Sequence, residues 1–386
     1  MNRRNFLQMA LLGGTLLALP GAVAPSNLPR RSTLIVLHLN GGNDGLNTVV
    51  PYQHPLYGRL RPGLALSPRE VLPLERGLGL HRSLSGLHKL FSEGQMAIAL
   101  GVGYPDPSFS HFRSAEIWNS GATDQASTGW LGRYLDLSRT CEGVPAASLQ
   151  PTPPMCLYGA KGPGLSFTDP DRFRLPESLQ GIDKLYAEES KRSGARGLVG
   201  RQGGVALAVA RRLSKIRPAQ QPQGPGLARD LRTALALLEA DLGLQVLHLS
   251  MDGFDTHVNQ RAQHARLLEQ LSQSLSVFQQ ELARRGLAEQ VLTMVYSEFG
   301  RRPAENSGGG TDHGTAGPVF LIGPGVRPGF HGQQSDLEKL ENDNLRHTLD
   351  FRSIYAGLLE GWLGAEPQRV LANTRPLVCV RSQARP

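Results

Sequence analysis

The sequence predicts a single large α/β domain built on a mainly parallel, doubly wound β-sheet. Short apolar runs rich in β-branched residues alternate with longer stretches whose apolar residues recur every three or four positions. Several of the short runs end in loops of glycine and polar residues, as buried parallel strands commonly do. The alternation continues to the end of the chain without an internal repeat, so one domain accounts for it.

The first elements form a strand, a helix and a second strand. Residues 33–39 are a continuous apolar run, and the glycine-rich segment 40–47 follows it directly. Residues 82–93 carry apolar side chains at helical spacing, and residues 96–102 are a second apolar run. This order is the βαβ unit of an open α/β sheet.

The second half of the chain repeats the pattern. The expected elements are a helix at 228–242, a strand at 245–250, a helix at 258–285, strands at 291–297 and 318–322, and a closing helix at 350–362. Between the halves, residues 140–226 contain proline-rich turns and a segment rich in Gly, Arg and Gln. We therefore expect an irregular insertion there, with a charged helical stretch near 181–193, inside one domain spanning 25–386.

Composition restricts the class of protein. The chain has 386 residues, of which 40% are hydrophobic and 19% charged, so it can bury a substantial core. The net charge of +8 is spread along the chain without a basic block interleaved with aromatics, which argues against nucleic-acid binding and allows attraction of anionic small molecules or polymers. Three cysteines favour neither a thiolate metal cage nor a disulfide scaffold, although Cys141 and Cys156 could form a bridge.

Residues 1–24 have the pattern of a twin-arginine export signal. Arg3 and Arg4 precede the apolar stretch 9–19, and small residues ending at Ala24 form a cleavage site. The stretch is too short for a permanent membrane span. We expect export by the twin-arginine translocase to the periplasm or cell envelope, a route that delivers folded chains, often with a metal already bound.

Residues 291–315 carry the strongest indication of a site. Glu298 lies at the end of an apolar strand, and Asp312 and His313 lie in the glycine-rich loop that follows. Mixed oxygen and imidazole ligands suit Zn, Mn or Fe better than Ca or Mg. Alternatively, Glu298 pairs with a neighbouring guanidinium such as that of Arg301.

The loop after residues 245–250 offers further ligands. Asp252 or Asp255, together with His257, could hold one side of the same cation. In the alternative interpretation, Asp252 forms a turn and Asp255 or Thr256 caps the long helix that follows.

Two other strand-end loops contribute candidates. Asp44 is either a further ligand or part of a tight turn. Ser108 or Ser110, at the start of a helix, could act as a nucleophile while Arg113 holds an anion, or Ser108 could simply be an N-cap.

With these residues in place, the chain resembles the exported family known as domain of unknown function 1501. The segments that carry the resemblance are residues 39–51, 103–105, 110–114, 129–133, 297–301 and 310–318. That family is grouped with the alkaline phosphatase and sulfatase superfamily, so the resemblance implies an alkaline-phosphatase-like doubly wound sheet with one or two divalent metals at the strand ends. It also implies that Asp252, His257 and His313 bind one metal, with Glu298 where a second Asp is usual.

Departures from the superfamily pattern bear on its chemistry. Asn40 stands where an Asp usually ends the first strand, with Asp44 as a substitute, and Phe299 stands where a His is usual. These changes weaken the case for a second metal. No Cys-x-Pro-x-Arg sulfatase signature occurs.

The sequence therefore predicts an exported, metal-binding hydrolase-like protein that cleaves phosphate or sulfate esters. The cation would activate Ser110 or a water, and Arg113 or Arg301 would hold the anion. The alternative is a non-catalytic envelope protein that binds a polysaccharide or another exported protein.

Overall fold

A computed structural model describes residues 32–137, 144–160, 164–168, 181–214, 226–372 and 374–381. The predicted export signal at 1–24 and Cys141 lie outside these residues. Cys156 and Cys379 are buried and reduced, and burial raises the pKa of the Cys379 thiol to about 12. Among the residues described, no helix is both long and apolar enough to cross a bilayer.

The centre of the molecule is one large sheet whose strand order is β11-β5-β10-β9-β1-β8-β6-β7, with β12 also pairing with β5. Its strands are β1 (Thr33–Leu39), β5 (Met96–Gly103), β6 (Ala146–Ser148), β7 (Leu165–Ser166), β8 (Val246–Met251), β9 (Val291–Tyr296), β10 (Gly317–Ile322), β11 (Gly329–His331) and β12 (Leu349–Asp350). Every pairing is parallel except those of β10, which runs antiparallel to both β5 and β9. The predicted α/β class with a mainly parallel sheet is confirmed.

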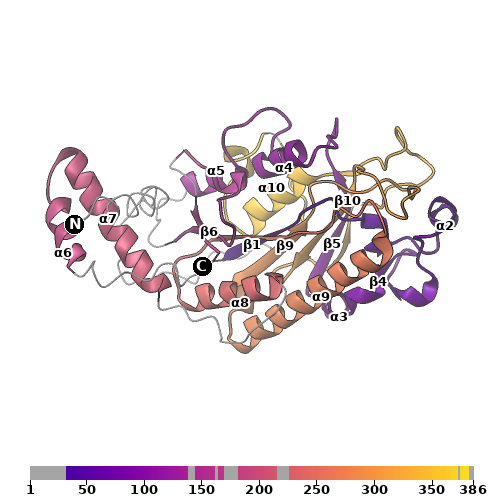
Figure 1. Cartoon of the computed structure of the whole chain (residues 1–386), viewed down its shortest axis with the longest axis horizontal. Coiled ribbons are helices and arrows are strands. Elements are labelled where there is room, and N and C mark those ends of the chain that lie inside the picture. Colours follow the sequence, from indigo (N-terminus) through magenta and orange to yellow (C-terminus); the bar gives the residue numbers. More distant parts are fainter. Residues whose placement is uncertain are drawn as a thin grey trace.

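Helices cover both faces of this sheet (Figure 1). One face packs against α3 (Ser85–Ser92), α8 (Gly226–Glu239) and α9 (Gln260–Arg284), and the other against α4 (His111–Ser120), α5 (Trp130–Leu137) and α10 (Phe351–Gly361). Side chains alternate between the faces along a strand, so in β1 Ile35 and Leu37 join one core while Leu34 and Val36 join the other. This alternation explains why β1 is apolar along nearly its whole length.

A smaller unit flanks the sheet near α2 (Figure 1). It consists of α2 (Pro55–Leu60) and the strands β2 (Val49–Val50), β3 (Val71–Pro73) and β4 (Gly79–His81), which surround a third apolar cluster. Short 3-10 helices occur at Gly45–Asn47, Pro68–Glu70, Arg82–Leu84, Met155–Leu157, Ala288–Gln290 and Pro367–Arg369.

The predicted irregular insertion contains a helical pair. α6 (Ile182–Ser190) packs against α7 (Gly194–Leu213), and the pair extends away from the sheet (Figure 1). The glycine content of α7 disfavours a helix by intrinsic propensity. Close packing between α6 and α7 explains the glycine at position 203, because a Cβ atom there would lie 2.3 Å from the Tyr186 ring. The expectation of irregular structure is therefore wrong for residues 194–213.

The orientation of β10 determines what meets at the functional edge of the sheet. The carboxyl ends of β1, β5, β8 and β9 share that edge because these strands are mutually parallel. Since β10 is antiparallel, the loop before it, rather than the loop after it, reaches the same edge. Backbone hydrogen bonds from Gly314 to Gly300 and from Arg302 to Asp312 fasten that loop to the end of β9.

Candidate metal centre

Three histidines and one aspartate converge at this edge. The Nε2 atoms of His257 and His313 are 2.9 Å apart. Asp255 Oδ1 lies 2.9 Å from Nε2 of His257 and 3.1 Å from Nε2 of His313. On the other side of the same carboxylate, Oδ2 is 3.5 Å from Nε2 of His111. His111, Asp255 and His313 each offer an atom within 4.8 Å of the others, a spacing that suits a metal ion.

These side chains come from separate segments of the chain. Asp255 and His257 lie in the loop after β8, His111 is the first residue of α4 in the connection after β5, and His313 lies in the loop before β10. A close backbone approach joins two of these loops, because a Cβ atom at Gly310 would lie 2.3 Å from the His257 carbonyl carbon. Glycine is therefore required at position 310 for the loops to meet.

Hydrogen bonds on the far side of each ring determine which nitrogen is protonated. His313 Nδ1 lies 2.8 Å from the carbonyl oxygen of Phe109, which can only accept, so Nδ1 carries the hydrogen. His257 Nδ1 faces the Asp312 carboxylate at 3.5 Å, which likewise favours a hydrogen on Nδ1. Both Nε2 atoms then present lone pairs toward each other and toward Asp255. Such lone pairs repel one another unless a cation lies between them.

Arg301 fixes the geometry around Asp255. Its buried guanidinium donates to Asp255 Oδ1 at 2.6 Å, and to the carbonyl oxygens of Gly42 at 2.6 Å and Thr311 at 2.7 Å. Burial by itself raises the pKa of Asp255, but the hydrogen bond and positive charge of Arg301 outweigh burial, and the pKa is lowered to about 2. Asp255 is therefore a permanent anion at neutral pH.

Glu298 lies beneath the cluster as a fully buried carboxylate. It accepts from His38 Nε2 at 2.9 Å, from His111 Nδ1 at 2.7 Å and from the Gly41 amide at 2.9 Å. Burial raises its pKa, but the His38 and His111 contacts lower it to about 2. Because an ionised carboxylate only accepts, His111 carries its hydrogen on Nδ1, and its Nε2 lone pair points into the cluster.

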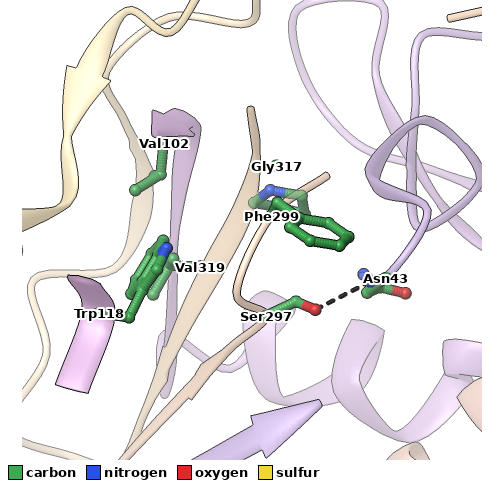
Figure 2. A pocket seen from close by; sticks show the side chains of 8 residues that line it. Asn43, Val102, Trp118, Ser297, Phe299, Gly317 and Val319 are labelled. Atoms are coloured by element: carbon green, nitrogen blue, oxygen red, sulfur yellow. Dashed lines mark hydrogen bonds between the residues drawn. The ribbon is translucent and has the colours of Figure 1, made fainter. Parts of the chain in front are cut away.

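Phe299 packs against the cluster. It also lines a small cavity, which Figure 2 shows. Its ring centroid lies 4.9 Å from that of His111 and 4.6 Å from that of His313. The cavity of about 10 Å³ also borders Ser297, whose hydroxyl accepts from the Asn43 amide at 2.9 Å. It has room for about one water molecule and is too small for an organic substrate. The open side of the cluster is where the side chains of His257 and Asp255 are 39% and 48% exposed.

Several sequence-predicted residues make contacts elsewhere. Asp44 is completely buried and pairs with Arg61 Nη1 at 2.6 Å, so its charge is already balanced away from the cluster. Asp252 is exposed and accepts from Asn40 at 2.8 Å. Arg113 donates to the Thr123 carbonyl and pairs with Glu116 at 2.8 Å.

The N-caps of α4 and α9 are not the residues that the sequence suggested. Ser110 is the N-cap of α4, but its side chain makes no capping hydrogen bond. Asn259 is the N-cap of α9, so neither Asp255 nor Thr256 caps that helix. Asp255 is thereby available to the cluster.

Sequence reasoning gave too little weight to three residues. Asp255 was one of two candidates in its loop, and the structure favours it over Asp252. His111 lies within a segment that carries the family resemblance, in which the sequence favours the neighbouring serines as nucleophiles. His38 interrupts an apolar strand, and a polar residue at that position was the available signal; its ring stacks on Tyr296 with centroids 4.9 Å apart.

The fold and this cluster define an α/β protein with a histidine and aspartate site at the carboxyl edge of its sheet. The family described as "Protein of unknown function (DUF1501)" matches residues 96–360, and the chain belongs to that family. No curated protein matches the sequence.

Solved structures resemble the chain distantly. Ps i-CgsB is 12% identical with a TM-score of 0.41, covering 89% of this chain and 75% of that one. Lipoteichoic acid synthase LtaP from Listeria monocytogenes is 12% identical with a TM-score of 0.33, covering 84% and 73%. Murine ectonucleotide pyrophosphatase/phosphodiesterase 5 is 9% identical with a TM-score of 0.33; the match covers 70% of this chain but only 57% of the murine protein.

Proposed function

We propose that the protein is an exported, metal-dependent hydrolase of phosphate or sulfate esters whose cation is held by Asp255, His257 and His313. The observation that carries the proposal is the 2.9 Å approach of two imidazole Nε2 atoms whose Nδ1 atoms face acceptors. A carboxylate oxygen lies within 3.1 Å of both nitrogens. A cation is the simplest group that makes this arrangement favourable.

The donor set suits a cation of intermediate hardness. Two imidazole nitrogens and one carboxylate oxygen match Zn, Mn or Fe. For Zn, bonds of about 2.0–2.2 Å place neighbouring ligand atoms roughly 3.3 Å apart, close to the separations here. Three protein ligands leave a position for substrate or water, as is usual in catalytic rather than structural zinc sites. A bound divalent cation supplies Lewis acidity toward an ester oxygen.

The charges around the cluster support an anionic substrate. Asp255 pairs with Arg301, Asp312 lies near Arg302, and Glu298 contacts His38 and His111. The three carboxylates and two guanidinium groups together carry one net negative charge. A divalent cation reverses that sign and makes the open side attractive to a phosphate or sulfate ester.

The chain's own residues position the reacting groups. Arg301 is occupied by Asp255 and by backbone carbonyls, so its role in this proposal is to hold Asp255 charged and oriented. Phe299 excludes water from one side of the histidines because its buried ring contacts two of them. The choice of phosphate and sulfate esters rests on the family resemblance in residues 297–301 and 310–318.

Elemental analysis and a substrate panel test the proposal together. Protein exported by its native host should contain about one Zn, Mn or Fe per chain and hydrolyse a phosphomonoester, a phosphodiester or an aryl sulfate. His313→Ala should lose both the metal and turnover. His88→Ala provides the matched control, because His88 is a partly exposed histidine of α3 whose ring bonds to the Pro73 carbonyl. Metal without turnover on any ester would favour the non-catalytic binding protein, and wild-type protein without metal would overturn the metal centre.

A further inference from the structure

We propose that His111 is the nucleophile of this site and that its Nε2 atom accepts the phosphoryl group of a phosphate ester. The inference rests on the proposed function, since it requires an ester at the cluster. It goes further by naming the attacking atom and the phosphoryl group that this atom would receive.

The orientation of His111 leaves one nitrogen free to react. Its Nδ1 donates to Glu298 Oε1 at 2.7 Å, and Glu298 is itself fixed by His38 and by the Gly41 amide. The ring is held between neighbours, with its centroid 4.9 Å from Phe299 and 4.5 Å from His313 in an edge-on contact. About a third of the side chain is exposed, 31%, so an incoming ester can reach Nε2.

The position of Nε2 separates His111 from the other two histidines. His257 and His313 approach Oδ1 of Asp255 at 2.9 and 3.1 Å, whereas His111 faces Oδ2 at 3.5 Å. If Oδ1 of Asp255 and the Nε2 atoms of His257 and His313 held the cation, Nε2 of His111 would stay outside that set of ligands.

The buried Glu298 carboxylate supports the charge that forms on the ring. In the first step the Nε2 lone pair attacks phosphorus, the bond to the leaving oxygen breaks, and that oxygen takes a proton from water. The phosphorylated ring keeps its Nδ1 hydrogen and becomes cationic, and the hydrogen bond to ionised Glu298 strengthens as it does so.

The second step returns the enzyme to its starting state. A water oxygen attacks phosphorus, the bond between nitrogen and phosphorus breaks, and the electron pair returns to Nε2. One proton of that water stays on the phosphate, and the other neutralises the hydroxide left by the first step. The sum is ester plus water giving alcohol plus hydrogen phosphate, so no additional reactant is needed.

The start of α4 assists the same reaction. His111 is the first residue of this ten-residue helix, and the Ser110 side chain does not cap it. The first-turn amide groups are therefore available to an anion, and the helix dipole favours negative charge there.

Chemical rescue tests the proposal. His111→Gly should reduce hydrolysis of p-nitrophenyl phosphate at least about a hundredfold, the scale expected for loss of a nucleophile. Added imidazole should restore part of the activity and accumulate N-phosphoimidazole, detected by phosphorus NMR. His88→Gly should show neither effect. Rescue without N-phosphoimidazole, or no rescue in a folded variant, would count against the nucleophile.

Trapping on the wild-type protein covers the case in which the glycine variant misfolds. Rapid quenching in alkali after mixing with a labelled phosphomonoester should leave an acid-labile phosphoryl group on the peptide containing His111. A label on Ser110 instead, or loss of metal from His111→Gly, would overturn the proposal by showing a serine nucleophile or a fourth metal ligand. If the wild type hydrolyses phosphate esters and none of these signals appears, only this inference fails. Hydrolysis of sulfate esters alone would likewise overturn only this inference. If neither phosphate nor sulfate esters are hydrolysed, both proposals fail.

Discussion

At the level of single residues, the chemistry of this site depends on which nitrogen of each histidine carries the proton. The Nδ1 atom of His111 faces the buried Glu298 carboxylate, and that of His313 faces the Phe109 carbonyl. Each acceptor fixes the hydrogen on Nδ1, so Nε2 of each ring keeps a lone pair. The sequence predicted His257, His313 and Glu298 as site residues because they lie in loops next to predicted strands. The sequence could not predict that Glu298 would accept a hydrogen bond from His111, because the two residues are 187 positions apart.

Two buried histidines away from the cluster make stability depend on pH. Burial lowers the pKa of His264 to about 4 and that of His248 to about 3, whereas an unfolded histidine titrates near 6.5. Both are therefore neutral in the folded protein and bind protons more readily when unfolded. Their contribution to stability is complete above about pH 6.5 and falls as pH decreases through about 4.

The urea midpoint of unfolding should accordingly decrease between pH 7 and pH 4.5. Each histidine contributes at most about 1.4 kcal/mol per pH unit in this window. A conservative His264→Gln replacement, which can still donate to Asn43, should make the decrease shallower. A midpoint of unfolding that does not change between pH 7 and pH 5 would show that these rings do not differ in protonation between the two states.

At the level of elements, the periodicity of apolar residues predicted the strands and helices. The pairing of strands in the sheet then determined which loops meet at the site. The expected strands at 33–39, 96–102, 245–250 and 291–297 lie within a residue or so of β1, β5, β8 and β9. Nothing in residues 318–322 indicates that β10 runs antiparallel, because orientation depends on β5 and β9, which lie far away in sequence. That orientation is what brings His313, which precedes its strand, to the same edge as His257, which follows its own.

Gly310 offers a test of how the loops before β10 and after β8 hold the site. In Gly310→Ala the new methyl group would lie 2.3 Å from the backbone of His257, so the two loops must separate. We expect a loss of stability of about 1–3 kcal/mol and weaker metal binding, measured by urea unfolding and by titration with Zn. Gly58→Ala is the matched control, because nothing lies within 4 Å of its added Cβ atom. Equal behaviour of the two variants would mean that the loops do not depend on this contact.

At the level of the whole molecule, the site joins loops that the sheet brings together from about 200 residues of sequence, His111 to His313. Composition and strand-end patterns predicted an α/β domain with a cation site at its strand ends. They placed Asp44 at the site because it follows β1, whereas burial beside Arg61 makes it part of the core. Whether a strand-end carboxylate faces solvent or core depends on the packing of the α2 segment, which local sequence does not reveal.

A cation bound across these loops should stabilise the folded molecule as a whole, because the unfolded chain has no assembled site. At a free metal concentration of about 100 times the dissociation constant, the stabilisation is about 2.7 kcal/mol. We expect the melting temperature of chelator-treated protein to rise by several degrees when Zn or Mn is restored, measured by calorimetry. His313→Ala should show almost no rise, whereas His88→Ala should match the wild type. A similar rise in His313→Ala and in wild type would place the stabilising cation elsewhere, because a cation that needs His313 cannot stabilise a chain that lacks it.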